Sequence, residues 1–195
     1  MENKNIKINN KSDKPDNIVL RDHKIIEKCI SYENKLPAFM KDYFIYLKGS
    51  VAVSTRSAYL EDIHFFCNYI VDETTLSKAQ TPKDITLEEF NKIKARDINL
   101  YLGDFCPRYY KEKENNTLIY ENNNRALARK KSSISTLFKF LYRNEQLDKN
   151  ITDGFNPIKL PKPQPDAIKR LDIDEVAIML DVVETGQGLT EKELV

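Results

Sequence analysis

The chain has 195 residues, enough for one domain of ordinary size or for one domain with part of a second. Hydrophobic residues make up 41 % of it, which is normal for a globular protein with a packed core. A content of only 5 glycines and 31 % charged residues favours helices over a many-turned β-sandwich. The net charge of +1 hides a basic block over 122–149, with a net charge of +5, and an acidic block over 171–195, with a net charge of −6.

The cysteines and the amino-terminal residues exclude several classes of protein. Cys29, Cys67 and Cys106 are too far apart in sequence for a metal-ligand pair, and an odd count does not suit a disulfide framework. No run approaches the roughly 18 apolar residues of a membrane-spanning helix, and the polar start does not resemble a signal peptide. We therefore expect a soluble, cytoplasmic protein with reduced thiols, no metal site, no cofactor and no membrane partner.

The first expected elements are a tail and a helix. Residues 1–17 are rich in Asn, Lys and Asp and have no periodicity, so we expect a disordered tail. Residues 18–31 have enough apolar side chains for a short element of undecided type. The following segment predicts a helix that begins near Pro37 and stops at Gly49. Its apolar residues have helical spacing: Leu36, Phe39, Met40, Tyr43, Phe44 and Leu47.

A second helix of roughly 19 residues is expected after Ser54, whose side chain is a suitable N-cap. Tyr59, Ile63, Phe66 and Ile70 share one face of this helix. Because other apolar side chains widen that face, we expect this helix to be the most buried.

Further along the chain, Thr86 and Glu89 predict a capping box at the start of a third helical region, which Pro107 ends. Residues 107–122 have the composition of a long loop, with a brief extended piece at 117–120.

A last helix is predicted over about residues 124–144, and its two faces differ sharply. At 100° per residue, one face is apolar: Leu127, Ile134, Leu137, Phe138 and Leu141. The opposite face, between about 140° and 220° from Ile134, holds only cations and hydroxyls: Arg125, Arg129, Ser132, Thr136, Lys139 and Arg143.

The absence of acids from this basic face points to an external partner. Like charges on one helix face repel, so an ordinary solvated face mixes signs. Phosphates neutralise Arg and Lys, hydroxyls add directional hydrogen bonds, and an α-helix fits the major groove of DNA. A merely solvated face remains the alternative. Lys130 and Lys131 lie beside the apolar face, so we expect their stems to pack there and their role in binding to be weaker.

Two helices resemble those of a known family. Residues 54–66, STRSAYLEDIHFF, are similar to the S-x-T-x-x-x-Y-x-x-D-[LI]-x-x-F helix of the core-binding domain in tyrosine recombinases of the phage-integrase and Xer type, with Thr55 one place early. Residues 128–138, ARKKSSISTLF, resemble the A-R-[RK]-L-S-A-L-R-S-F-[YF] helix of the same domain. Lys131 and Ser135 depart from the usual Leu and Arg.

Two further segments resemble the same family in the same order. Asn156-Pro157 followed by residues 160–163, LPKP, is similar to the linker between its two domains. Residues 171–176, LDIDEV, look like the L-[ST]-x-x-E-[VI] start of its catalytic domain. The resemblance covers about residues 36–185.

The resemblance implies an all-α fold and a DNA partner. It implies a SAM-like bundle of four main helices over 18–155, a Pro/Lys-rich linker over 156–170, and the first helix of a catalytic domain over 171–195. The second and fourth helices would face double-stranded DNA. The parent enzyme would cut and rejoin DNA through a phosphotyrosine, for integration or recombination, as a tetramer on paired sites. We expect this chain to be monomeric without DNA.

The catalytic residues of that family are not found in this sequence. Thr185-Gly186 begins like the T-G-[LI]-R box, but no arginine follows Arg170. His23 and His64 do not fit the H-x-x-R box. We therefore expect the chain to stop before the catalytic arginine, to bind DNA and not to cut it.

The last helix and the start of the second supply the candidate DNA contacts. These are Thr55, Arg56, Arg125, Arg129, Lys130, Ser132, Ser133, Thr136, Lys139 and Arg143. Two other functions stay open: a stand-alone helical DNA-binding regulator, and a protein-interaction module whose basic face meets an acidic partner. Salt-dependent affinity for duplex DNA separates the DNA readings from the last one.

The two faces predict opposite effects of substitution. Ile134→Ala should lower the free energy of unfolding by about 2–5 kcal/mol and leave DNA affinity unchanged, because Ile134 lies on the apolar face. Arg129→Ala should weaken DNA binding without lowering thermal stability. Thermal denaturation and a duplex titration measure both, and an Arg129 variant that melts early would show that the faces are misassigned.

Overall fold

The computed structural model describes residue 11 and residues 13–113, 116–160 and 172–185. The chain forms two compact units, Met1–Leu160 and Pro161–Val195.

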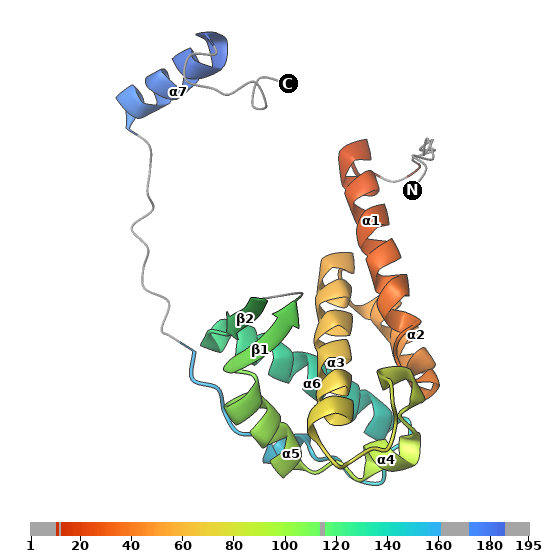
Figure 1. The fold of residues 1–195 in the computed structure, drawn as a ribbon. Helices are drawn as coiled ribbons and strands as arrows, with labels where there is room; N and C mark the ends of the chain where they lie inside the picture. Colours follow the sequence, from red (N-terminus) through yellow and green to blue (C-terminus); the bar gives the residue numbers. More distant parts are fainter. Residues whose placement is uncertain (1–10, 12, 114–115, 161–171, 186–195) are drawn as a thin grey trace. The chain divides into compact units, whose positions relative to one another are not determined.

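The first unit is mostly helical and contains one small sheet (Figure 1). Its α-helices are α1 Asp16–Glu33, α2 Lys41–Ser50, α3 Val53–Glu73, α4 Leu87–Asn91, α5 Ala95–Leu100 and α6 Asn124–Arg143. Short 3₁₀ turns occur at Ala38–Met40, Pro82–Asp84 and Thr152–Gly154, and a π turn at Tyr101–Phe105 continues α5. The strands are β1 Arg108–Lys113 and β2 Asn116–Glu121.

Helix α3 packs between α1 and α6 (Figure 1). Two ion pairs join α1 to α3: Lys28 Nζ lies 2.9 Å from Glu61, and Arg56 Nη2 lies 2.5 Å from Glu33. Helix α3 buries side chains on most of its circumference, so the expectation that it is deeply buried is confirmed.

The apolar face predicted for α6 is confirmed: Leu127, Ile134, Leu137, Phe138 and Leu141 are all buried. Phe138 stacks on Phe90 of α4, with ring centroids 4.9 Å apart. The helix begins at its predicted place because the side chain of Asn123 accepts a hydrogen bond from the Ala126 backbone N–H at 3.0 Å. Packing on one side thus leaves the opposite side of α6 outward.

Several expected boundaries differ from the structure. The tail was expected to reach residue 17, but α1 already begins at Asp16, and residues 1–10 lie outside the described part. The undecided segment 18–31 is part of that helix. Ser54 is not an N-cap, because α3 starts one residue earlier, at Val53. The third helical region is broken into α4, α5 and the π turn rather than forming one main helix.

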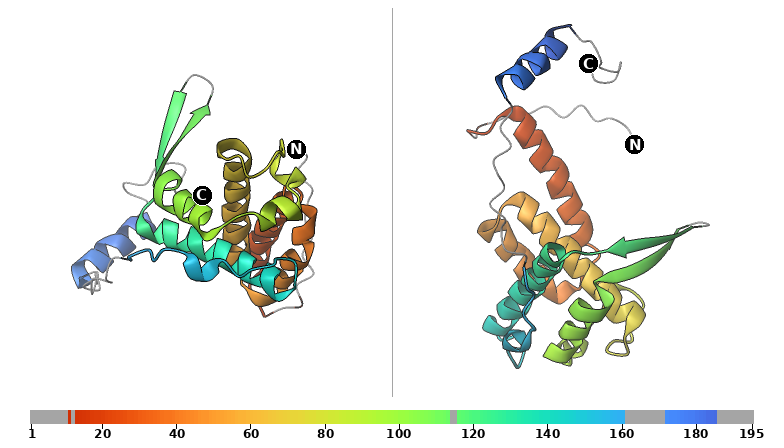
Figure 2. Two further views of the ribbon diagram at one scale, coloured as in Figure 1. Left: turned by 90° about the horizontal axis from the view of Figure 1, so that it is seen from below. Right: turned by 90° about the vertical axis from the view of Figure 1, so that its left-hand side faces the viewer.

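The loop expected over 107–122 is instead an antiparallel hairpin, in which Tyr109 pairs with Tyr120 and Tyr110 with Ile119. The extended piece expected at 117–120 is confirmed within β2. The rings of Tyr109 and Tyr120 stack with centroids 5.0 Å apart, which stabilises the paired strands. Both views of Figure 2 show the hairpin extending away from the helices.

The start of the expected linker, residues 156–160, is held against the first unit. Lys131 Nζ donates to the Asn156 carbonyl at 2.8 Å, and Asn124 Nδ2 donates to the Lys159 carbonyl at 2.7 Å. The rest of the expected linker, 161–170, lies outside the described residues. In the second unit, α7 spans Ile173–Thr185 and exposes its apolar side chains.

The predicted capping box at α4 is confirmed and is larger than expected. Glu89 accepts hydrogen bonds from the Thr86 and Lys78 backbone N–H groups and from the Ser77 hydroxyl. The Lys78 and Thr86 backbone donors lower the pKa of Glu89 to about 2. This carboxylate therefore ties the segment after α3 to the start of α4.

Glu89→Gln should lower the free energy of unfolding at neutral pH by about 1 kcal/mol, because a neutral amide accepts these bonds more weakly. The folded pKa lies below the ordinary value of 4.5, so the stabilisation is present above pH 4.5 and is lost as the pH falls towards 2. The free energy of unfolding, measured with denaturant between pH 4.5 and about pH 2, should therefore fall less steeply with decreasing pH for Glu89→Gln than for the native chain. Glu88→Gln, at the exposed neighbouring position, is the control, and equal slopes for both variants would contradict the assignment.

Candidate nucleic-acid interface

The outer face of α6 carries the cations that the sequence placed there. Arg125, Lys139 and Arg143 are exposed, and within the described residues no ion pair joins any of them to an acid. Ser132 is exposed and Thr136 is half-buried on the same face. The predicted alignment of charges and hydroxyls on one side of α6 is therefore confirmed. We call these five residues and Arg129 the basic face.

Two shallow hollows follow the basic face and meet at Thr136 and Lys139. One, of about 480 Å³, is lined also by Tyr59 of α3 and by Ile158. The other, of about 310 Å³, lies towards α2 and has Tyr46 in its wall. Together the hollows follow the basic face from Ser132 to Arg143, with Lys139 at the junction.

The hydroxyls of the basic face are already engaged as donors. Ser132 Oγ donates to the Ala128 carbonyl at 3.0 Å, and Thr136 Oγ1 donates to the Ser132 carbonyl at 2.8 Å. An oxygen that has used its proton offers only lone pairs, which do not attract a phosphate. The cations, and not these hydroxyls, therefore carry the attraction for anions.

Arg129 differs from the other cations because it is bound to the protein. Its Nη1 lies 2.7 Å from Asp62 Oδ2 and 3.1 Å from the Ala58 carbonyl oxygen, both in α3. The Arg129 side chain nevertheless remains 43 % exposed, whereas that of Asp62 is 1 % exposed. Arg129 is therefore bound to a buried carboxylate through one nitrogen, while part of its side chain remains exposed to solvent.

Asp62 has two further partners, both from α6. Lys130 Nζ lies 3.2 Å from Asp62 Oδ1, and Ser133 Oγ lies 2.9 Å from Asp62 Oδ2. Burial raises the pKa of Asp62, while Lys130, Arg129 and Ser133 oppose that shift. The two cations within 3.2 Å favour the ionised form of the carboxylate. We call these four residues the Asp62 cluster.

Three of the candidate DNA contacts have buried side chains, which does not favour a direct contact with DNA. Arg56 is 6 % exposed and paired with Glu33, Lys130 is 7 % exposed, and Ser133 is fully buried. Each satisfies a charge or hydrogen bond inside the protein and has no outward surface for a phosphate. Thr55, at the start of α3, is half-buried.

Sequence reasoning missed Asp62, although the signal was present. The residue is an acid within the apolar face of α3, next to Ile63 and one turn from Tyr59 and Phe66. A buried charge needs partners of opposite sign, and Arg129 and Lys130, which are neighbours in the sequence, supply them.

The remaining surface features do not resemble a catalytic centre. A hollow of about 550 Å³ near α4 and α5 is lined by apolar side chains such as Phe90 and Phe138 together with polar and charged residues such as Lys94 and Asp97. Among the described residues, no three His, Cys, Asp or Glu side chains group as metal ligands. Cys29, Cys67 and Cys106 are buried free thiols. None of the described helices combines the length and apolar content needed to cross a membrane.

The chain was compared with known proteins at three levels. It matches no protein-family model, no curated protein sequence and no solved structure.

The geometry reverses one expectation for Arg129. Arg129→Ala should lower the free energy of unfolding by about 1.5 kcal/mol, because it removes a hydrogen-bonded cation from a buried carboxylate while Lys130 and Ser133 remain. Arg125→Ala, on the same face without an acidic partner among the described residues, should change it by less than about 0.5 kcal/mol. Thermal and denaturant unfolding measure both, and equal stability of the two variants would contradict a structural role for Arg129.

Proposed function

We propose that this chain binds double-stranded DNA through the basic face of α6. The single observation that carries the proposal is the row formed by Arg125, Lys139 and Arg143, exposed and without acidic partners among the described residues. Arg and Lys in such a row gain free energy by replacing counterions on phosphates. One face of α6 packs against the protein and its cationic face points outward. An α-helix exposed in this way fits the major groove of DNA.

The length and grooving of the face support a duplex rather than a single small anion. Arg125 and Arg143 are 18 positions apart, which corresponds to about 27 Å along a helix. Cations at both ends of the face thus meet phosphates on well-separated parts of a duplex. The hollows beside Lys139 leave room for groups that approach between these ends.

As a finer proposal, the chain is the core-binding half of a site-specific tyrosine recombinase. The support is the resemblance of residues 54–66, 128–138, 156–163 and 171–176 to that family, together with the outward basic face of the helix that the resemblance assigns to DNA. On this proposal the first unit is a SAM-like bundle, α7 opens a catalytic domain, and the whole enzyme assembles as a tetramer on paired sites. DNA binding by the chain needs no cofactor.

Titration of a labelled duplex at several salt concentrations tests the proposal. The native chain should bind at about 50 mM salt and lose affinity steeply by about 200 mM. Replacing Arg125, Lys139 and Arg143 together by Ala should make the slope of log affinity against log salt shallower by about 2.7, because three phosphate contacts are lost. The melting temperature of this triple variant should stay close to that of the native chain, because all three residues are exposed.

A charge-matched control separates this face from general electrostatics. Lys24, Lys41 and Lys83 are exposed lysines on other elements, and replacing all three by Ala removes the same net charge. The control should keep the native slope. No binding at low salt, or equal slopes for the two triple variants, would overturn the proposal.

A further inference from the structure

We infer that Asp62 is a positioning residue for DNA binding, which holds the Arg129 guanidinium so that its unused edge faces a backbone phosphate. The inference rests on the proposed function and adds a buried carboxylate and a buried lysine to the residues that determine affinity. Neither touches DNA. Asp62 and Lys130 act only through Arg129.

The hydrogen bonds of Arg129 divide its guanidinium into a bound and an available part. Both bonds made by its side chain within the described residues start at Nη1, one to Asp62 and one to the Ala58 carbonyl. A guanidinium has five N–H donors, so the Nε and Nη2 edge keeps its donors. That edge presents two parallel N–H groups, the arrangement that binds two phosphate oxygens at once. The Arg129 side chain as a whole is also 43 % exposed, which leaves part of it open to an approaching phosphate.

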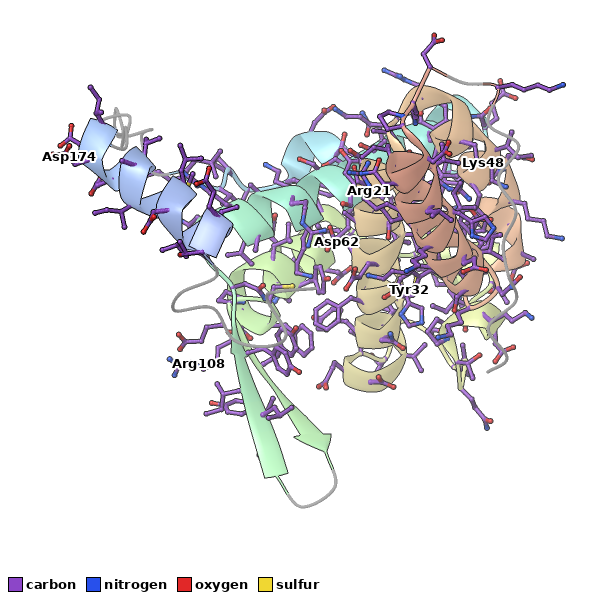
Figure 3. The ribbon with its side chains drawn as sticks, turned by 90° about the horizontal axis from the view of Figure 1, so that it is seen from above. Arg21, Tyr32, Lys48, Asp62, Arg108 and Asp174 are labelled. Carbon is purple, nitrogen blue, oxygen red and sulfur yellow. The ribbon has the colours of Figure 1, made fainter. Side chains whose placement is uncertain are left out.

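Anchoring matters because arginine is a flexible side chain. A free arginine loses rotamer entropy when it binds a phosphate, whereas one already fixed through Nη1 has lost that freedom in the folded protein. In Figure 3 Asp62 lies on α3, on the side next to α6, and so fixes Arg129 from a neighbouring helix. The Arg129 guanidinium is therefore held by Asp62 of α3, and not by contacts within α6 alone.

Lys130 solves the problem that an anchoring carboxylate creates. An unneutralised Asp62 would repel the phosphate that Arg129 binds. Lys130 Nζ lies 3.2 Å from Asp62 Oδ1 and 4.5 Å from the centre of the Phe65 ring, and its side chain is 9 % exposed. With two cations for one acid, the Asp62 cluster keeps one positive charge, and that charge lies at its exposed member, Arg129.

The first experiment removes both buried charges together, since Asp62→Asn alone would leave Lys130 buried and unpaired. The double variant Asp62→Asn/Lys130→Met replaces the buried pair with neutral side chains of similar size, and Arg129 stays charged but loses its ionic anchor and keeps only neutral acceptors such as the Ala58 carbonyl. Duplex affinity should fall by about 2- to 10-fold. The salt slope should stay native, because the number of phosphate contacts is unchanged.

A mutant cycle distinguishes positioning from a general structural effect. Adding Asp62→Asn/Lys130→Met to the Arg129→Ala variant should cause no further loss of affinity, since the pair acts only through Arg129. An equal loss in both backgrounds would show a structural effect and overturn the inference, as would native affinity of the double variant. Thermal melting of each variant checks that the proteins compared are folded.

Arg129→Lys keeps the inference testable if the double variant does not fold. Lysine retains the charge but has one ammonium group, which cannot bind Asp62 and two phosphate oxygens as a planar fork does. Affinity should fall by about 2- to 10-fold with a native salt slope, and unchanged affinity would overturn the inference. If the native chain does not bind duplex DNA at low salt, the proposed function itself fails. If it binds but the cycle shows no coupling, only the role of Asp62 fails.

Discussion

The arrangement of α3 and α6 depends on one buried carboxylate, Asp62. A carboxylate that is 1 % exposed is costly unless cations and hydrogen-bond donors surround it, and α6 supplies Arg129, Lys130 and Ser133 for this purpose. These three partners lie within two turns of one helix, so they meet Asp62 together only at one register of α6 against α3. The apolar contacts around Ile134 would tolerate small shifts of that register, whereas the charged contacts do not.

This constraint explains why a strongly basic helix has two different kinds of cation. Arg125, Lys139 and Arg143 point away from the packed face and have no acidic partner among the described residues, so their charge is available to an external anion. Lys130 is buried, and its charge is paired with Asp62. Arg129 belongs to both groups, since one nitrogen is bound to α3 and the rest of the head is exposed. In the proposed function, Arg129 therefore contributes both to the stability of the helix pair and to phosphate binding.

Contacts between distant segments complete the first unit. Lys131 of α6 donates to the carbonyl of Asn156 and so ties the segment around Asn156 to this helix. The hairpin is held at its base by Asn122, whose side chain donates to the Cys106 carbonyl and whose backbone N–H donates to the Pro107 carbonyl. Both sets of contacts join residues that are far apart in the sequence or on two sides of a turn. Helical periodicity in the sequence therefore could not predict them.

The sequence by itself determined the helical class, the extent of α6 and the side of α6 that packs, because a 3.6-residue period and the sign of charge are local properties. The capping box at Thr86 was also local and was predicted correctly. Only the tertiary structure decided that Arg56, Lys130 and Ser133 are internal and that residues 107–122 form a hairpin. Whether a cation beside an apolar face turns inward depends on an acid brought near it by another helix. Glu33 provides that acid for Arg56 of α3 and Asp62 provides it for Lys130 of α6, and the spacing within either helix does not reveal its partner.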